Sequence, residues 1–337
     1  PDPRPEAGHL LVKTLACTIC ASDHHMVHHG HRLAAWSTEH GGPFNFDPHR
    51  DVVLGHEICA EIIELGPNTT AGYSIGQRVV TQAPLLHSGG MDVLGYSNRF
   101  PGGFAEYMVM SEAMVLPVPD ALPDDVAALA EPLSVGMQYS RIADPRPNEV
   151  PLVIGCGAIG LATVSALKAR GHGPVIAADY SPMRRATAAA AGADVVLDPV
   201  EENAFEVWAR EAPHGSACLV FECVGAAGVL DSIFTDAPFM SRVIVAGQCL
   251  DNDTIFAGAA HTKALNVQFG GIPMPVDFER SLAALADGSV DGAAWITGTS
   301  SLDEAVAAFD ASTDTERHTR IAVHPVSYTH LTLPTKE

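Results

Sequence analysis

A stretch near the start of the chain, residues 15–32 with the sequence LACTICASDHHMVHHGHR, gathers two cysteines and five histidines. Thiolate and imidazole are ligands that zinc prefers, so this composition suggests a metal site. Cys17 and Cys20 have C-x-x-C spacing, but no second such pair exists, and the histidines do not complete the C-x₂-C…H-x₃₋₅-H pattern of closed structural sites. The stretch therefore supplies individual ligands at most.

Further metal-ligand candidates stand outside this stretch. His56 and Glu57 occur in the sequence LGHE at the start of an apolar run, and Glu131 occurs in LAEPL where the character of the chain changes. One cysteine, one histidine and one or two glutamates make a set suited to catalytic zinc, which keeps one position open for water or substrate. Spacing alone leaves open whether they converge.

A glycine-rich turn predicts dinucleotide binding. In VPLVIGCGAIG, the glycines Gly155, Gly157 and Gly160 follow an apolar strand and open a helix whose first residues are Ala158 and Ile159. Such a turn brings a pyrophosphate close to the backbone and to the N–H groups of the helix.

An acidic residue follows this motif at the expected distance. Asp179 ends the next predicted strand, where it would accept hydrogen bonds from ribose hydroxyls and repel a 2′-phosphate, which favours NAD over NADP. A helix-capping role is the alternative for Asp179. Arg184, one helical turn on, is predicted to lie over the adenine or to be solvated.

Two kinds of element must position these groups. Residues 9–119 read as short strands joined by Gly/Pro turns, typical of an antiparallel barrel, with strands at 9–16, 57–66, 77–83 and within 103–119. From residue 131, apolar strands alternate with helices, which predicts a parallel sheet covered on both faces. The last helices are predicted at 277–286 and 301–311, before a strand at 319–325.

Three segments are assigned apart from these elements. Residues 28–50 are expected to be long and irregular, and the uncharged run 150–167 is not a membrane span because Pro151 and three glycines interrupt it. The chain begins without Met, and the first strand of the barrel is expected to be missing. Residues 326–337 differ in composition from what precedes them and are interpreted as a non-native tail.

Composition excludes several partners. The net charge is −21, with 19 Lys and Arg against 40 Asp and Glu, so neither nucleic acid nor an anionic membrane is an expected partner. The seven cysteines follow no disulfide framework, which favours a reducing, cytoplasmic location.

Several ordered motifs together resemble one family. CTICASDHH, GHEICAEIIELGPN, GQRV, GGFAEY, AEPLSVGMQ and VIGCGAIG stand in the order seen in zinc-dependent medium-chain alcohol dehydrogenases, especially the polyol and sorbitol dehydrogenase branch. The resemblance implies an α/β fold: a doubly wound Rossmann sheet at 133–269 and a GroES-like antiparallel β-barrel catalytic domain at 1–132 and 270–325.

The resemblance also implies roles for single residues. Cys20 and His56 match the zinc ligands, and Glu57 and Glu131 match glutamates that complete or exchange in the shell of one catalytic zinc. Asp23 matches the acid that orients the ligand histidine. Ser22 and His25 match the proton relay. The remaining imidazoles are interpreted as exposed loop side chains, namely His24, His28, His29 and His31.

The family pattern is not followed everywhere. Residues 60–155 contain no cysteine, so the four-cysteine structural zinc lobe of many relatives is absent, and Gln138 replaces a frequent histidine. The implied activity is NAD-dependent oxidation of a secondary alcohol or polyol by a homo-oligomer, a dimer or tetramer. Two alternatives remain: a threonine- or butanediol-type dehydrogenase, and a dinucleotide-binding redox sensor without turnover.

Overall fold

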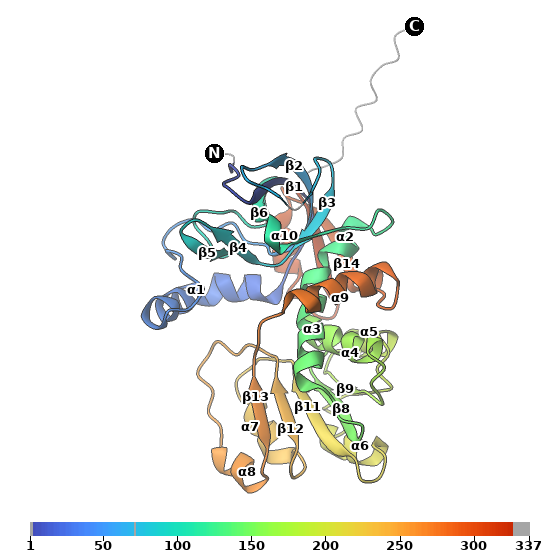
Figure 1. Ribbon diagram of the computed structural model, residues 1–337. Helices are drawn as coiled ribbons and strands as arrows, with labels where there is room; N and C mark the ends of the chain where they lie inside the picture. Colours follow the sequence, from blue (N-terminus) through green and yellow to red (C-terminus); the bar gives the residue numbers. More distant parts are fainter. Residues whose placement is uncertain (1–2, 71, 326–337) are drawn as a thin grey trace.

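Two large sheets organise the protein in a computed structural model that describes residues 3–70 and 72–325 (Figure 1). The first sheet has seven strands in the order β14-β15-β1-β2-β3-β7, with β6 also paired to β1. Its pairings are antiparallel except β14 with β15. Its strands are β1 His9–Thr18, β2 Glu57–Leu65, β3 Arg78–Thr81, β6 Tyr107–Ser111, β7 Val115–Pro117, β14 Ile296–Ser301 and β15 Arg320–His324.

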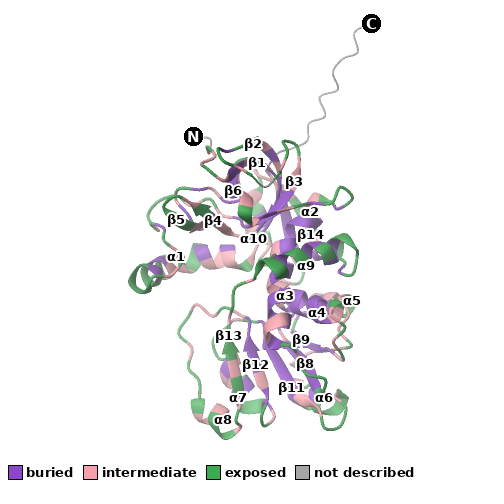
Figure 2. Cartoon of the chain, in the orientation of Figure 1, coloured by how far each residue is buried: buried purple, intermediate pink, exposed green. Residues whose placement is uncertain are grey.

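The second sheet has six parallel strands in the order β10-β9-β8-β11-β12-β13. This order, with its reversal between β8 and β11, is that of a doubly wound dinucleotide-binding sheet. The central strands are almost wholly buried, as near-continuous apolar runs must be when helices cover both faces (Figure 2). The strands are β8 Glu149–Ile154, β9 Ile176–Ala178, β10 Val195–Leu197, β11 Ala217–Glu222, β12 Arg242–Val245 and β13 Asn266–Phe269.

The α/β fold class, with both predicted architectures, is confirmed. The exact domain bounds remain a prediction. Two strands within 103–119 are separated by the short 3-10 turn Glu112–Met114, and the hairpin of β4 Pro84–His87 and β5 Gly90–Val93 was not predicted. The predicted tail, 326–337, lies outside the described residues. The run 150–167 divides into β8, a turn and α4, and no helix among the described residues is long and apolar enough to cross a bilayer.

Helices surround the parallel sheet and join it to the first sheet. Their starts follow local capping: the side chain of Asn203 accepts hydrogen bonds from the N–H groups of Phe205 and Glu206 in the first turn of α6. The predicted helix at 301–311 is shortened because β14 extends to Ser301. The helices from α2 on are α2 Asp124–Ala128, α3 Ala130–Ala143, α4 Ala158–Ala169, α5 Pro182–Ala190, α6 Ala204–Glu211, α7 Val229–Asp236, α8 Ala257–Thr262, α9 Pro275–Ala286, the 3-10 helix η2 Ala293–Trp295 and α10 Ala305–Ala311.

The expectation of an irregular segment at 28–50 is wrong, because α1 Ala21–His40 is a long helix that occupies its first part. Its buried stripe consists of Met26, Gly30, Ala34 and Ser37, which recur at helical spacing. Three of these four are small or polar, so the stripe leaves no apolar periodicity for a sequence reading to detect. The helix ends at Gly41, whose φ of +72° is left-handed and suits glycine.

Candidate metal and dinucleotide site

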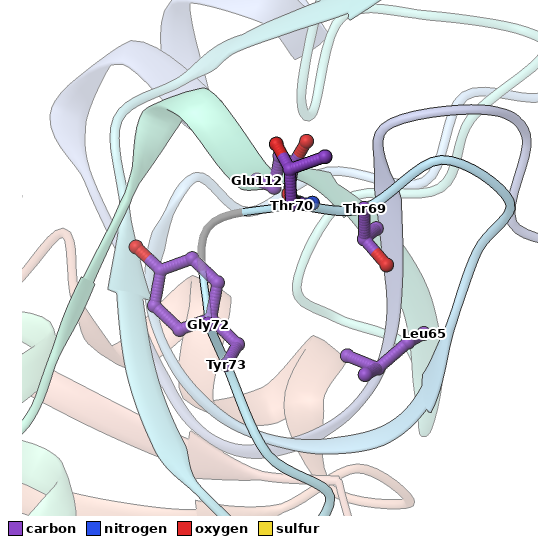
Figure 3. Close-up of a pocket in the computed structure, with 6 residues that line it drawn as sticks. All are labelled: Leu65, Thr69, Thr70, Gly72, Tyr73 and Glu112. Carbon is purple, nitrogen blue, oxygen red and sulfur yellow. Dashed lines mark hydrogen bonds between the residues drawn. The ribbon is translucent and has the colours of Figure 1, made fainter.

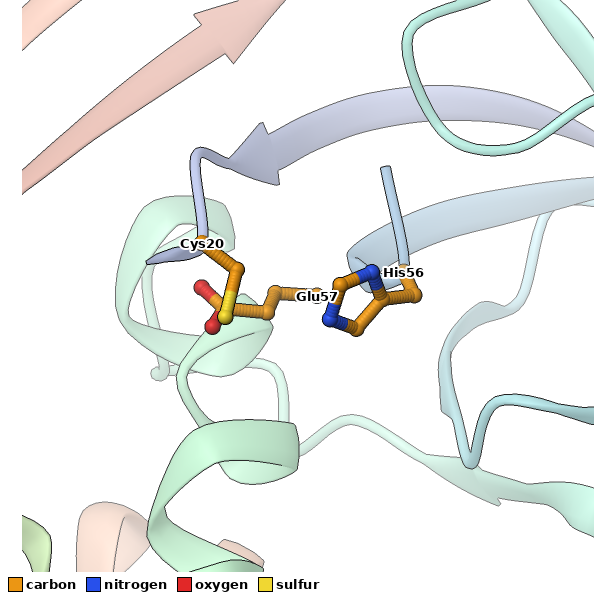
Figure 4. Close-up of side chains that lie close together, drawn as sticks. All are labelled: Cys20, His56 and Glu57. Carbon is orange, nitrogen blue, oxygen red and sulfur yellow. The ribbon is translucent and has the colours of Figure 1, made fainter. Parts of the chain in front are cut away.

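Three potential metal ligands converge where β1 ends and β2 begins. Donor atoms of Cys20, His56 and Glu57 all lie within 4.8 Å of one another (Figure 4). The antiparallel register explains the meeting, because Thr18 pairs with Glu57 and Cys20 follows two residues later as the N-cap of α1. Residues far apart in sequence are thus placed together by the pairing of two strands.

The donor set fits zinc chemically. Thiolate, imidazole and carboxylate are all zinc ligands, and three protein ligands leave a fourth position open. Burial, reinforced by Glu57, raises the pKa of the Cys20 thiol, against the opposite effect of His56. Burial acts to lower the pKa of His56, yet Tyr96 and Asp23 raise it well above its usual value. The buried carboxylate of Asp23 thus favours positive charge at the imidazole of His56.

Asp23 is fully buried and contacts the residues of the metal-ligand set or their neighbours in the chain. Its Oδ2 accepts a hydrogen bond from the Cys20 N–H at 2.9 Å, and its Oδ1 accepts one from Gly55 at 3.2 Å and lies 3.5 Å from His56 Nδ1. One carboxylate thus holds the backbone beside both the thiol and the imidazole. This arrangement suits the predicted role of orienting the ligand histidine.

Glu57 is completely buried and has an ionic partner that the sequence reading did not identify. Arg320 Nη2 lies 3.0 Å from its Oε1, and the Thr18 hydroxyl donates a hydrogen bond to Oε2. The available signal was an arginine opening an otherwise apolar strand, TRIAVHP. A buried carboxylate paired in this way is held in place next to the other two donors.

Glu131 begins α3 and does not belong to the three-residue set. Burial raises its pKa to about 7; the charges of His56 and Arg320 oppose that rise, and those of Glu57 and Asp23 add to it. These couplings place Glu131 within electrostatic reach of the set. A carboxyl group with a pKa of about 7 at this place can take or release a proton near neutral pH, or serve as an exchanging ligand.

The predicted relay residues occupy the first turns of α1. Ser22 Oγ is 3.1 Å from His56 Nε2, so its hydroxyl faces the metal-ligand set. His25 is half-buried, and within the described part of the chain no hydrogen bond joins it to Ser22. Its Nδ1 is buried without a partner. The Ser22 to His25 relay therefore stays a prediction.

The glycine-rich turn has the geometry that phosphate binding requires. Gly155 has φ of +91°, and a Cβ atom at Gly160 would stand 1.8 Å from the carbonyl oxygen of Gly155. Gly157 is the N-cap of α4, with Ala158 and Ile159 in the first turn. Only glycine permits this turn and the close packing of helix on strand, so the cradle fits a dinucleotide.

Asp179 is largely buried at the end of β9. Its two oxygens accept hydrogen bonds from the N–H groups of Cys156, at 2.7 Å, and of Ser181, at 2.8 Å. The carboxylate therefore supports the turn and the start of α5 together, and Ser181 is the residue that caps α5. The Arg184 guanidinium lies about 4 Å from the Cβ position of Gly157, which places it beside the phosphate cradle.

The two sites are connected by α3. This helix begins at the metal-ligand set with Glu131 and packs against α4, the helix that opens at the glycine turn. Contact is close at Gly136, where a Cβ atom would come within 2.3 Å of Ala162. Packing of α3 on α4 therefore fixes the start of α3, near the metal-ligand set, relative to the glycine-rich turn.

The expectation of exposed loop imidazoles is corrected, since all four lie on α1 and two of them, His24 and His29, are only partly exposed. His24 stacks on Phe309, with ring centres 3.8 Å apart, and its Nε2 is 2.8 Å from Ser312 Oγ.

A surface hollow lies at the far end of β2 from the metal-ligand set (Figure 3). It is lined by Leu65, Thr69, Thr70, Gly72, Tyr73 and Glu112. It has no part in that chemistry.

Comparisons with known proteins agree with this geometry. Residues 6–120 match the alcohol dehydrogenase GroES-like domain, and residues 158–287 match the zinc-binding dehydrogenase family. L-galactonate-5-dehydrogenase of Escherichia coli K12 is 30% identical over 302 residues, which cover 86% of this chain and 83% of that protein.

Two further relatives are similar over less of the chain. (R,R)-butanediol dehydrogenase of Bacillus subtilis is 29% identical, covering 72% of this chain and 71% of its own length. L-threonine 3-dehydrogenase of Pyrococcus horikoshii is 30% identical, with coverages of 60% and 57%. The solved structure of 2R,3R-butanediol dehydrogenase from Bacillus subtilis shares the fold, with a TM-score of 0.80 at 24% identity over 97% of this chain and 95% of that one.

Proposed function

Because the chain belongs to the zinc-dependent medium-chain alcohol dehydrogenase family, we propose that it oxidises a secondary alcohol or polyol to a ketone with NAD, and catalyses the reverse. The observation that carries the proposal is the convergence of Cys20, His56 and Glu57, joined through α3 to a glycine cradle. Zinc and a nicotinamide dinucleotide are the cofactors of this family.

In this proposal Cys20 and His56 hold zinc, and Glu57 or Glu131 completes the shell. Bound zinc supplies Lewis-acid polarisation of the substrate oxygen, which makes the hydroxyl easier to deprotonate. Asp23 keeps His56 in a ligating orientation through its place beside Nδ1. Arg320 balances the charge of Glu57, which limits the net negative charge on the ligand set.

Ser22 and His25 move the hydroxyl proton. Ser22 Oγ faces the ligand set and is the first acceptor, and His25 passes the proton toward solvent. Burial, together with the neighbouring His29, His24 and His28, lowers the pKa of His25, so its imidazole is neutral and able to accept a proton at neutral pH.

The dinucleotide cradle positions the hydride acceptor. The bound nicotinamide ring supplies the hydride chemistry, and the chain fixes the pyrophosphate at the N-terminus of α4. Asp179 favours NAD because its negative charge repels a 2′-phosphate. Arg184 lies beside the cradle, where its guanidinium would be close to the bound cofactor.

Relatives that act on butanediol and on threonine favour a second candidate substrate class, a vicinal diol or a 3-hydroxy amino acid. The redox-sensor alternative is disfavoured by the intact three-donor set, which a protein without turnover has no need to retain.

The seven cysteines are free thiols, which supports a reducing, cytoplasmic location.

A test combines metal analysis with a panel of secondary alcohols, polyols, diols and threonine. Purified protein should contain one zinc per chain and reduce NAD with at least one member of the panel. Cys20→Ser should lose zinc and activity together, whereas Cys249→Ser, a partly exposed thiol outside the set, should keep both. Zinc-free protein that still oxidises alcohols would contradict the proposal.

A further inference from the structure

Three histidines of α1 lie one helical turn apart. His25 and His29 are separated by four residues and His28 by three, so their side chains share a face of the helix. The rings of His25 and His29 are the nearest pair, with centres 6.4 Å apart and planes at 76°. None of the three belongs to the Cys20, His56 and Glu57 set.

These rings are free of hydrogen bonds to protein throughout the described residues. The Nδ1 atom of His25 is buried without a partner, although a buried polar atom normally has one. Other histidines of the same helix are already engaged: His24 with Ser312 and Phe309, His31 beside His49, and His40 with the carbonyl of Trp36. The face formed by His25, His28 and His29 therefore has ring nitrogens available for a ligand.

The ligand that such a face suits is a divalent transition-metal ion. Neutral imidazole binds Zn²⁺, Cu²⁺ and Ni²⁺ well and Mg²⁺ poorly. Two imidazoles on one tetrahedral ion, with Zn–N of about 2.0–2.1 Å, have ring centres about 5 Å apart. Closing the gap from 6.4 Å requires rotation of the His25 and His29 side chains, which are both partly exposed, beside the exposed His28.

We propose that His25 and His29, with His28 beside them, form a second, regulatory site for Zn²⁺ or a similar ion on α1. An ion bound there occupies a nitrogen of His25 and prevents that ring from accepting the proton passed on by Ser22. Excess Zn²⁺ then inhibits turnover without displacing the first zinc. The binding site stands on the geometry of α1 alone, whereas the inhibition rests on the proposed relay.

The experiment is equilibrium dialysis of the purified zinc-containing enzyme against increasing Zn²⁺ in a non-chelating buffer, with zinc and protein measured at each step. Wild type should take up a second equivalent, and His29→Gln should lose it while keeping the first. His40→Gln is the matched control, an exposed histidine about three turns further along the same helix whose contacts are with Trp36, and should bind two. An equal concentration of Mg²⁺ should not reduce the uptake.

Turnover measured in parallel separates the two parts. Excess Zn²⁺ should slow wild type and His40→Gln several-fold and leave His29→Gln unaffected, with equal rates for all three at stoichiometric zinc. No second equivalent in wild type, or its survival in His29→Gln, would overturn the site. A second ion that binds through His29 without slowing turnover would uphold the site and overturn the relay role of His25.

Discussion

At the scale of single residues, neighbouring side chains on α1 have different roles although they look alike in sequence. Ser22 faces His56, Asp23 lies beneath the ligand set, and His24 packs against Phe309. His25 is half-buried and keeps both ring nitrogens free of protein partners within the described residues. The surroundings of successive side chains therefore differ, because each residue of the helix points in a different direction.

His25→Gln should slow turnover by about 10- to 100-fold, at the bottom of the range for general acid–base groups, because the end of the relay is open to solvent. The loss should be largest at lower pH, where hydroxide and other solvent bases are scarce. A pH–rate profile with zinc analysis checks this. His31→Gln should match wild type. Loss of zinc from His25→Gln would show instead that this ring is a ligand.

Asp179→Asn should narrow the preference for NAD over NADP by about tenfold or more, which corresponds to about 1.4 kcal/mol. The amide removes the charge that repels a 2′-phosphate but keeps one oxygen for the N–H groups of Cys156 or Ser181. The ratio of kcat/KM for the two cofactors is the measurement. Equal efficiency of the wild type with NAD and NADP would refute this role.

At the scale of elements, α3 and α9 pack against each other and help to fix the position of one sheet relative to the other. The guanidinium of Arg141 on α3 makes two 2.7 Å hydrogen bonds to Asp277 on α9, and Asp277 also accepts the N–H of Met274 that begins this helix. A hydrophobic cluster of Leu133, Phe278 and Trp295, among others, surrounds this contact. The position of Glu131, at the start of α3, depends on that packing.

Arg141→Met should lower the free energy of unfolding by about 2–3 kcal/mol. The loss of a partner leaves the fully buried carboxylate of Asp277 unpaired, but Arg141 is about a third exposed, so water compensates in part. Denaturant unfolding is the measurement. Arg210→Met, which breaks exposed pairs with Glu202 and Glu211, is the control and should change the free energy of unfolding far less than Arg141→Met does.

At the scale of the whole molecule, one edge of the parallel sheet is uncovered. Within the described residues β13 is the last strand of this sheet (Figure 2). Its residue Phe269 is 65% exposed, and Ile272 and Met274, which follow it in the chain, are exposed too. Free strand edges with apolar side chains are sites of pairing with another chain. We therefore expect the homo-oligomer predicted from the sequence to pair through this edge, with a second copy of the chain as the partner.

Phe269→Lys should therefore reduce the assembly to a smaller species, because a charge on an edge strand opposes pairing. Sedimentation of wild type and variant gives the masses. Val200→Lys is the control: Val200 is 77% exposed, follows β10 near the opposite edge, and should leave the mass unchanged. A wild type that sediments as a monomer, or a variant with unchanged mass, would refute this interface.

The sequence by itself determined the alternating strands and helices after residue 131, the glycine turn and the identity of the donor residues. These depend on local rules: apolar runs of strand length, and positions such as Gly155 and Gly160 where only glycine fits. The short strand β14 and the hairpin β4–β5 were missed, because brief strands with little apolar alternation carry weak local signals.

Only the tertiary structure decided which candidates meet. The convergence of Cys20, His56 and Glu57 follows from the register of β1 on β2, and Arg320 reaches Glu57 because β15 pairs with β1. Likewise, α1 is a helix whose buried stripe of small residues becomes visible only against Phe46 and Tyr96. Long-range strand pairing and packing leave no pattern in the local sequence. Residues distant in the chain can therefore be assigned to one site only from the folded structure.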